Sequence, residues 1–314
     1  MQLTAGAMSF DWNSNWAQVP GHITLGYTHG VAVDRQGLVH VFNQSQHAVV
    51  SFTADGEFVS TWDQFPSDRF LGAHGLTYLD TPEGEFFWLT DQRSCEVVKT
   101  TLAGETVLSL ARPDHPVYRE PGAKYSPTWV AESPVDGVIF VADGYGSGYI
   151  SRYDKTGQYI DSFDGSAGAG RFSTPHGVQI FSRPHAHAGD DQPMLYVTDR
   201  SNARIQIFDL NCKFIRSFPQ QHPCCFAEHP ATGELLIPDL HAFVALYDQH
   251  DRIIDTLGDN REIVGAHGWP NVPQNMRVDG KFNSPHGGTF DHDGNLYIVE
   301  WIADGRITKL TRRP

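Results

Sequence analysis

The stretch Thr28 to Asn43, THGVAVDRQGLVHVFN, contains two short apolar runs separated by the turn sequence Asp-Arg-Gln-Gly. A short valine-rich run, a turn with glycine and a second such run are typical of a β-hairpin. The pattern recurs along the 314 residues, so internal repetition decides the fold. Four copies open with His-Gly and two are degenerate, and the six opening residues are His29, His74, Trp129, His176, Cys225 and His286.

Each hairpin is followed by two further short strands, as in Ile150–Tyr153 and Gln158–Phe163. Four short strands in roughly 40 to 50 residues are the signature of one propeller blade. The last copy has only three strands after His286, and the N-terminal segment Met8–Trp12 is expected to supply the fourth and cover the open edges. The sequence therefore predicts an all-β, six-bladed β-propeller, one domain over residues 1–314, with its ring closed by an N-terminal strand.

Charge and composition exclude several classes of partner. Lys and Arg number 23 against 37 Asp and Glu, a formal net charge of −14, so a phosphate backbone or an anionic membrane surface would be repelled. No window of about 18 uncharged apolar residues exists, and the start lacks the pattern of a signal peptide. We expect a small-molecule substrate, no nucleic-acid or membrane partner and a cytoplasmic location. The oligomeric state stays open.

The four cysteines, Cys95, Cys212, Cys224 and Cys225, follow no zinc-knuckle or disulfide spacing. A reducing compartment is consistent with this usage. The adjacent Cys224 and Cys225 could bind metal or react, but we interpret them first as two buried, small hydrophobic side chains.

The opening residues predict a metal site. In a blade the first strand is innermost, so its first residue lies near the axis at one rim. Blades two, four and six are related by about 120°, which brings His74, His176 and His286 into a threefold ring. Three imidazoles converging on an axis fit a tetrahedral or octahedral metal with open coordination positions, the pattern of a catalytic rather than a structural site. The alternative is that each histidine only bonds neighbouring backbone. His29, in an odd blade, is expected to support the site or to be structural.

Residues that follow the second strand of each blade reach the same rim, because that strand is antiparallel to the first. Tyr145 is the candidate general base, since a phenol beside a divalent cation ionises more easily. Arg200 is the candidate partner for a carboxylate or a developing oxyanion. Gln44, Trp129 and Trp301 are predicted to contact substrate. The alternative for Tyr145 and Arg200 is simple packing and hydrogen bonding in the mouth.

Three loops also carry predictions. Two long connections, Ala111–Pro127 and Gly258–Ser284, lead to the same rim, and loops of such length are usually functional. We expect them to act as lids. His185 and His187 have metal-ligand spacing, but they fall in a hairpin at the opposite rim and are interpreted as a solvated loop.

These motifs resemble the peptidyl-α-hydroxyglycine α-amidating lyase family, a six-bladed propeller of NHL-type repeats. The resemblance runs over most of the chain and is best at the stretches Ala73–Thr77 with Trp88–Asp91, Ile139–Tyr145, Pro175–Val178 with Val197–Gln206, and Ser284–His286. It implies that His74, His176 and His286 hold a catalytic divalent metal, usually zinc. It also implies that Tyr145 acts as the base and that Arg200 supports the substrate.

The chain departs from the family at three positions. Gln44 stands where the family has a second active-site arginine, and the loss of this charge weakens the case for a peptidyl-hydroxyglycine substrate with its free carboxylate. Gly287 replaces an acid that binds structural calcium, so calcium is not expected. Gly146 replaces a disulfide cysteine, which agrees with a reducing compartment.

The sequence predicts a metal-dependent lyase that breaks a carbon–heteroatom bond at a hydroxylated carbon, with a substrate that need not be a peptide. The first alternative is a metal-dependent hydrolase such as a lactonase, in which the same metal activates water. The second is a non-catalytic NHL-type binding module, because a fold does not determine a function.

Overall fold

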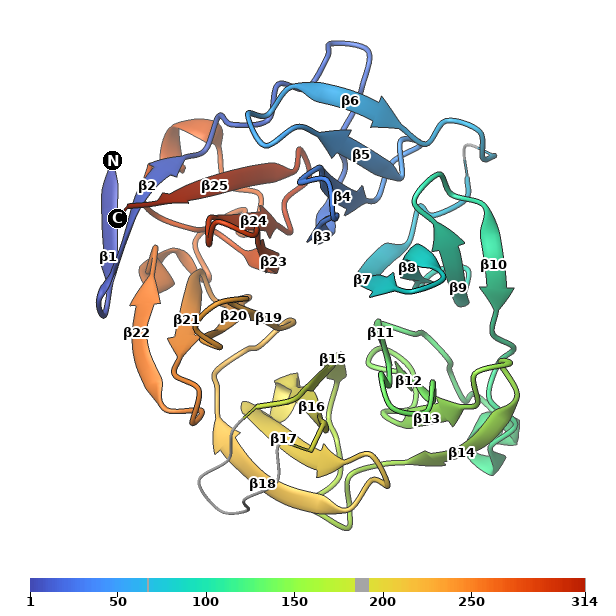
Figure 1. Ribbon diagram of the computed structural model, residues 1–314. Coiled ribbons are helices and arrows are strands. Elements are labelled where there is room, and N and C mark those ends of the chain that lie inside the picture. The colour runs from blue at the N-terminus through green and yellow to red at the C-terminus, as the bar shows by residue number, and fades with distance from the viewer. Residues whose placement is uncertain (67, 184–191, 314) are drawn as a thin grey trace. The chain divides into compact units, whose positions relative to one another are not determined.

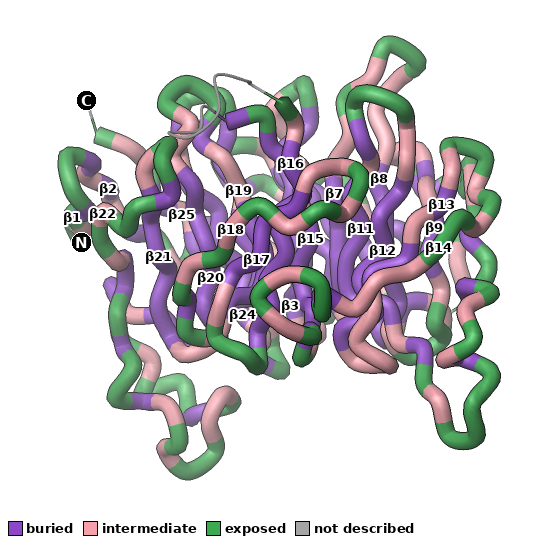
Figure 2. Tube along the Cα trace, turned by 90° about the horizontal axis from the view of Figure 1, so that it is seen from below, coloured by how far each residue is buried: buried purple, intermediate pink, exposed green. Residues whose placement is uncertain are grey.

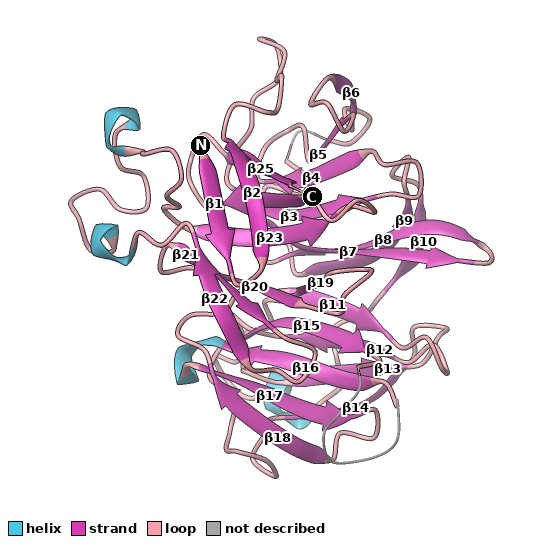
Figure 3. Ribbon diagram, turned by 60° about the vertical axis from the view of Figure 1, so that its left-hand side comes forward, coloured by secondary structure: helices cyan, strands magenta, loops and turns pink. Residues whose placement is uncertain are grey.

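The computed structural model describes residues 1–66, 68–183 and 192–313. Almost all of its regular structure is β-strand, and Figure 3 shows helical segments confined to short turns within loops. The strands form six antiparallel sheets, and the fold is the six-bladed β-propeller that the repeats predict. The chain divides into two compact units with three sheets each, which are described separately. The assignment of residues 1–314 to a single domain stays a prediction.

The first unit contains the beginning and the end of the described chain, residues 1–66, 68–71 and 226–313. Its first two sheets are β3 (Thr28–Val33), β4 (Val39–Asn43), β5 (Val49–Phe52), β6 (Phe58–Thr61), and β19 (Ala227–Glu228), β20 (Leu235–Asp239), β21 (Phe243–Tyr247), β22 (Ile253–Leu257). Its third sheet has the order β1 (Gln2–Ala5), β2 (Met8–Asn13), β25 (Arg306–Arg312), β24 (Leu296–Glu300), β23 (Pro285–Phe290).

The N-terminal strand completes this third sheet, as predicted. β2 pairs antiparallel with β25, with Trp12 opposite Leu310 (Figure 1). A strand that the sequence did not predict, β1, pairs with β2 and adds a fifth strand at the edge. The two ends of the chain are therefore joined through one sheet.

The second unit contains residues 72–183 and 192–225 of the described chain. Its three sheets each have their strands in chain order from one edge to the other. They are β7 (Ala73–Thr81), β8 (Gly84–Asp91), β9 (Glu96–Thr101), β10 (Thr106–Ser109); β11 (Trp129–Glu132), β12 (Ile139–Ala142), β13 (Ile150–Tyr153), β14 (Tyr159–Phe163); and β15 (Pro175–Phe181), β16 (Met194–Asp199), β17 (Arg204–Asp209), β18 (Phe214–Pro219).

Burial explains the apolar pattern of the repeats. Inner strands such as β20 and β21 are buried along their whole length, because neighbouring sheets cover both faces. The outermost strand of a sheet alternates, as β18 does between half-buried and exposed residues. Figure 2 shows buried stretches along β17, β20 and β21 and exposed stretches in the loops. The cores lie between adjacent sheets, for example where Trp129 and Phe140 meet Val178 and Val197.

An aspartate turn closes many of the hairpins. Asp34 Oδ1 accepts hydrogen bonds from the backbone nitrogens of Gln36 (2.9 Å) and Leu38 (2.8 Å), and Asp154 and Asp291 repeat this pattern in their own turns. Gly37 has φ +83° at the tight point of the first turn, a conformation in which glycine is unstrained. The turn sequences in the repeats therefore act through side-chain to backbone hydrogen bonds.

Candidate metal and catalytic site

The predicted histidine ligands of the second unit lie in β-bulges at the start of a blade. Ala73 pairs with Asp91 and Leu76 with Leu89, so His74 and Gly75 together face the single residue Thr90. Thr90 Oγ1 accepts a hydrogen bond from Gly75 N at 2.8 Å. A bulge of this kind bends the strand and redirects a side chain.

His176 repeats the arrangement in the fourth blade. Pro175 pairs with Asp199 and Val178 with Val197, so that His176 and Gly177 face Thr198. Thr198 Oγ1 accepts from Gly177 N at 2.6 Å. The His-Gly pair and a threonine in the facing strand are thus one structural unit that aims an imidazole.

Backbone carbonyls of the following blade fix the orientation of these two imidazoles. Nδ1 of His74 donates to the Thr128 carbonyl at 2.8 Å, and Nδ1 of His176 donates to the Cys224 carbonyl at 2.7 Å. A Cβ atom at Gly75 or Gly177 would lie 2.4 or 2.5 Å from the same carbonyl oxygens, so glycine is required for the approach. Because a carbonyl only accepts, Nδ1 carries the proton and Nε2 presents its lone pair.

The two Nε2 atoms lie 3.0 Å apart, and both side chains are fully buried. Two lone pairs at this distance repel unless a proton or a cation lies between them. Nitrogen ligands about 2.0–2.1 Å from a tetrahedral zinc are separated by about 3.3 Å, which is close to the observed distance. The tautomers and spacing of His74 and His176 therefore fit a shared divalent metal.

Tyr145 lies against both imidazoles. Its Oη is 3.0 Å from His176 Nε2 and 3.2 Å from His74 Nε2, and it accepts a hydrogen bond from Arg200 Nη2 at 3.0 Å. Burial raises the pKa of the Tyr145 phenol above its ordinary value, although the charge and hydrogen bond of Arg200 act in the opposite direction. Without further positive charge the phenol therefore stays protonated at neutral pH.

Asp143 holds the loop that carries Tyr145. Its carboxylate accepts hydrogen bonds from the backbone nitrogens of Ser126 and Ser147, both at 2.6 Å, and from the Tyr118 hydroxyl at 2.9 Å. Gly146 packs directly on this carboxylate, since a Cβ there would lie 2.0 Å from Asp143 Oδ1. A larger residue at position 146 would force this loop to move.

Arg200 begins the 3₁₀ turn η2 (Arg200–Asn202) directly after β16, and only 8% of the residue is exposed. Its guanidinium carbon lies 5.2 Å from the centre of the Tyr145 ring. Burial lowers the pKa of Arg200, but interactions with Tyr145 and Cys224 outweigh this effect and the guanidinium remains charged. Within the described chain Nε and Nη1 have no hydrogen-bond partner, so two buried donors remain for another molecule.

Trp129 packs on the two ligands. Its ring centre is 6.2 Å from that of His74 and 6.4 Å from that of His176, and the residue is buried. The second unit thus brings together five of the predicted site residues, His74, Trp129, Tyr145, His176 and Arg200.

The first unit contains the remaining predicted residues. Nδ1 of His286 donates to the His29 carbonyl at 3.1 Å, and the two imidazole centres are 4.4 Å apart. A Cβ at Gly287 would lie 2.3 Å from the same carbonyl oxygen, so His286 is oriented in the same way as His74 and His176. His29 supplies this carbonyl, which agrees with the supporting role expected for it.

Gln44 and Trp301, the predicted substrate contacts of the first unit, both neighbour Tyr27. Gln44 N donates to the Tyr27 carbonyl at 3.0 Å, and the Trp301 ring centre lies 5.4 Å from the Tyr27 ring. Both residues are partly exposed. Their contact with a substrate stays a prediction.

Two features escaped the sequence analysis. Unlike β7 and β15, strand β11 has no bulge at its start, with Trp129 paired to Ala142 and Val130 to Val141. The carbonyl groups that accept hydrogen bonds from His74 and His176 belong to Thr128 and Cys224. Each of these residues lies one position before a predicted opening residue, Trp129 or Cys225. For His74 and His176 the threonine in the facing strand, Thr90 or Thr198, was the available signal, because its hydroxyl takes the place of a ladder hydrogen bond.

Each long connection is anchored by a few aromatic side chains, although many of its residues are exposed. In the connection 111–127, Tyr118 and Tyr125 are buried, and Tyr118 bonds to Asp143 as described above. In the connection 258–284, Trp269 Nε1 donates to the Asn283 carbonyl at 2.9 Å. Their action as lids stays a prediction, and His185 and His187 lie outside the described residues.

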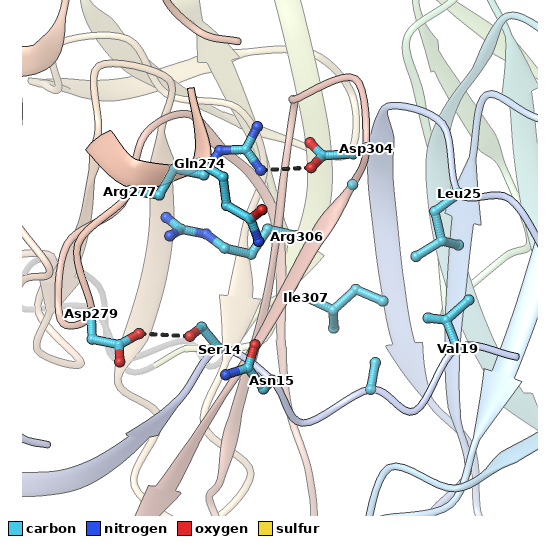
Figure 4. A pocket seen from close by; sticks show the side chains of 12 residues that line it. Ser14, Asn15, Val19, Leu25, Gln274, Arg277, Asp279, Asp304, Arg306 and Ile307 are labelled. Atoms are coloured by element: carbon cyan, nitrogen blue, oxygen red, sulfur yellow. Dashed lines mark hydrogen bonds and ion pairs between the residues drawn. The ribbon is translucent and has the colours of Figure 1, made fainter. Parts of the chain in front are cut away.

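An opening of about 450 Å³ lies beside Tyr145, lined by the loop Gly144–Gly148 and by Phe172, Ser173 and Thr174. A pocket of about 360 Å³ in the first unit has a different character (Figure 4). There Arg277 pairs with Asp304 at 2.7 Å and Ser14 donates to Asp279 at 2.7 Å, and no imidazole or thiol lines it among the described residues.

The fold and the site define a propeller with paired imidazoles, a phenol and a buried guanidinium. No established protein-family profile matches the chain. The chain is 28% identical to the mouse peptidyl-glycine alpha-amidating monooxygenase over 232 residues, which cover 63% of this chain but only 22% of that protein. It is 28% identical over 150 residues to a probable peptidyl-alpha-hydroxyglycine alpha-amidating lyase of Caenorhabditis elegans, covering 46% and 39% of the two chains.

The mouse NHL repeat-containing protein 3 is 30% identical over 247 residues, which cover 73% of this chain and 64% of that protein. These similarities confirm the resemblance drawn from the motifs: the chain is a distant homologue of amidating-lyase and NHL-repeat proteins. The region it shares with the amidating monooxygenases is a small part of their length.

Solved structures share the fold at low identity. A streptogramin B lyase covers 99% of this chain and 100% of its own with a TM-score of 0.61 and 15% identity. A gluconolactonase of Xanthomonas campestris covers 92% and 87% with a TM-score of 0.61 and 14% identity. The structural neighbours are propeller enzymes, and identities this low show the shared fold alone. The described residues form no helix that is long and apolar enough to cross a membrane.

Proposed function

We propose that this chain is a metal-dependent lyase that breaks a carbon–heteroatom bond at a hydroxylated carbon, with an N-acyl-α-hydroxyglycine or a similar small anionic molecule as substrate. One observation carries the proposal: a single hydroxyl, Tyr145 Oη, joins Nε2 of His74, Nε2 of His176 and Nη2 of Arg200. A proton acceptor, a ligand pair and a buried positive charge thus meet at one point.

His74 and His176 would hold the metal, with His286 as the third ligand that the sequence predicts. A divalent metal bound there, zinc for imidazole donors, would supply Lewis acidity that favours ionisation of the hydroxyl on the reacting carbon. The two Nδ1 hydrogen bonds to backbone carbonyls keep both Nε2 lone pairs directed at the site. The chain therefore orients its ligands before substrate arrives.

Arg200 would bind the substrate carboxylate. Its Nε and Nη1 are buried donors without a partner in the described chain, and leaving a charged donor unpaired in this way is costly. A carboxylate would accept from both nitrogens and place the neighbouring carbon beside Tyr145.

Tyr145 as phenolate would then take the hydroxyl proton of the substrate. As the carbonyl forms, the carbon–nitrogen bond breaks and its electron pair stays on the amide nitrogen, which takes the proton back from Tyr145. The products are a primary amide and an α-keto or aldehyde acid, with no net change in protons and no oxidant. Trp129, packed on both imidazoles, would help to exclude water from the ligands.

The test uses the metal-loaded chain with an N-acyl-α-hydroxyglycine and identifies the acyl product by mass spectrometry. A primary amide together with glyoxylate supports the lyase. A carboxylic acid that carries one solvent oxygen would instead establish a hydrolase. Metal uptake without turnover of any α-hydroxy amide would reject the proposed reaction.

A further inference from the structure

The fold places Cys224 beside His176, one of the two proposed metal ligands of the second unit. It follows β18 and is fully buried, and its backbone carbonyl is the acceptor that fixes His176. The equivalent residue beside His74 is Thr128, whose carbonyl has the same role. The two junctions therefore have the same backbone geometry but different side chains.

The two side chains behave differently. Thr128 Oγ1 lies 3.2 Å from both the Ala142 and the Pro175 carbonyls, so its hydroxyl is used to join backbone segments. The Cys224 sulfur lies 3.8 Å from the His222 carbonyl. The two junctions therefore differ in that one carries a hydroxyl and the other a sulfur, which is a soft metal donor.

The thiol lies within the candidate site. Cys224 Sγ is within 4.8 Å of a ring nitrogen of His176. Cys224 also interacts with the side chains of Arg200 and Tyr145.

We infer that Cys224 is a further ligand of the proposed metal, so that the centre is a mixed nitrogen and sulfur site rather than one of imidazoles alone. The inference rests on the metal centre proposed above. Zinc ligands at about 2.3 Å for sulfur and 2.0–2.1 Å for nitrogen lie about 3.6 Å apart in a tetrahedron, which is within the limit observed for Cys224 and His176.

A thiolate ligand would determine which metals the proposed centre prefers. His74, His176 and Cys224, all in the second unit, present two nitrogens and one sulfur. Such a donor set selects zinc and other thiophilic metals against magnesium and calcium, which take oxygen ligands. Binding would release the thiol proton, so metal uptake is accompanied by proton release.

X-ray absorption at the zinc edge on the wild-type, zinc-loaded chain tests the inference without any substitution. We expect a sulfur shell at about 2.3 Å next to a nitrogen shell at about 2.0–2.1 Å. A zinc environment of nitrogen and oxygen alone would overturn the role of Cys224 and leave the proposed lyase intact. A chain that takes up no zinc would overturn both.

The matched variants are Cys224→Ser, which keeps the carbonyl that holds His176, and Cys225→Ser, which changes the buried neighbour. With cobalt in place of zinc, the sulfur-to-metal charge-transfer band should appear in the wild type and in Cys225→Ser and be lost in Cys224→Ser. Zinc affinity should fall by at least about tenfold in Cys224→Ser and stay unchanged in Cys225→Ser. A charge-transfer band that persists in Cys224→Ser would assign the sulfur to another residue.

Discussion

Replacing Tyr145 by Phe distinguishes a catalytic role of the hydroxyl from a structural role of the aromatic ring. The substitution keeps the ring that packs on His74 and His176 but deletes the oxygen that contacts both imidazoles and Arg200. If the phenolate is the base, turnover should fall by about 10²–10⁴, the usual contribution of a positioned proton acceptor. This loss corresponds to about 2.7–5.4 kcal/mol in activation free energy.

The free energy of unfolding should change by a smaller amount. The variant leaves Arg200 Nη2 without its hydrogen bond, which costs about 1.5–3 kcal/mol for a charged donor. Metal content should stay close to that of the wild type, because both Nδ1 hydrogen bonds remain. Tyr149→Phe is the matched control, since its hydroxyl lies on the same loop but 3.4 Å from Arg171, away from the imidazoles.

The assay is single-turnover release of the primary amide, measured for the wild type and both variants over a range of pH. The wild-type rate should rise with pH until the phenol is ionised, because only the phenolate accepts a proton. This rising limb should be absent in Tyr145→Phe and present in Tyr149→Phe. Near wild-type turnover of Tyr145→Phe would refute the assignment of the base and favour the hydrolase.

Four further outcomes are expected. Arg200→Ala should lower kcat/KM for a carboxylate substrate by about 10²–10³ without loss of metal, and an equal loss on the uncharged ester analogue would make Arg200 structural. His176→Ala should remove most of the metal in elemental analysis, and normal content would exclude it as a ligand. Gly177→Ala should destabilise the chain by about 1–3 kcal/mol in denaturant unfolding, because its Cβ meets the Cys224 carbonyl; an unchanged midpoint would contradict the close approach. Burial raises the pKa of Asp34, but hydrogen bonds from His40 and the turn backbone outweigh it and hold the pKa below 3.8. The Asp34 carboxylate therefore stabilises the folded chain above pH 3.8, and this stabilisation is lost as the pH falls through the pKa that Asp34 has in the folded state. The difference in Tm between the wild type and Asp34→Asn should shrink over this pH range. A difference in Tm that stays constant would refute the stabilising role of the charge.

The fold could be predicted because each blade repeats the same local signals. Alternating strands, aspartate turns and His-Gly starts recur at matching positions, and even the strand that completes the last sheet was accessible, since one strand was missing from the final copy. β1 could not be predicted, because its four residues, half of them exposed, carry little pattern.

The candidate site could be predicted less completely. Tyr145, Arg200, His74 and His176 could be placed together, because antiparallel pairing brings blade starts and second-strand ends to one rim. For the Cys224–Cys225 pair the sequence left metal binding open but favoured two buried hydrophobic side chains. The sequence interpretation of Cys224 as a small buried hydrophobic residue gave its burial but not its neighbours.

The backbone carbonyls that orient the imidazoles also affect how such a site can change in evolution. Each imidazole is held by a main-chain oxygen of the next blade, and that oxygen is present whatever side chain its residue carries. The side chains of His29, Thr128 and Cys224 can therefore be exchanged without removing the carbonyl that orients the neighbouring imidazole. Protein engineers could vary Cys224, the proposed sulfur ligand, to retune metal choice while the backbone hydrogen bonds to the imidazoles remain.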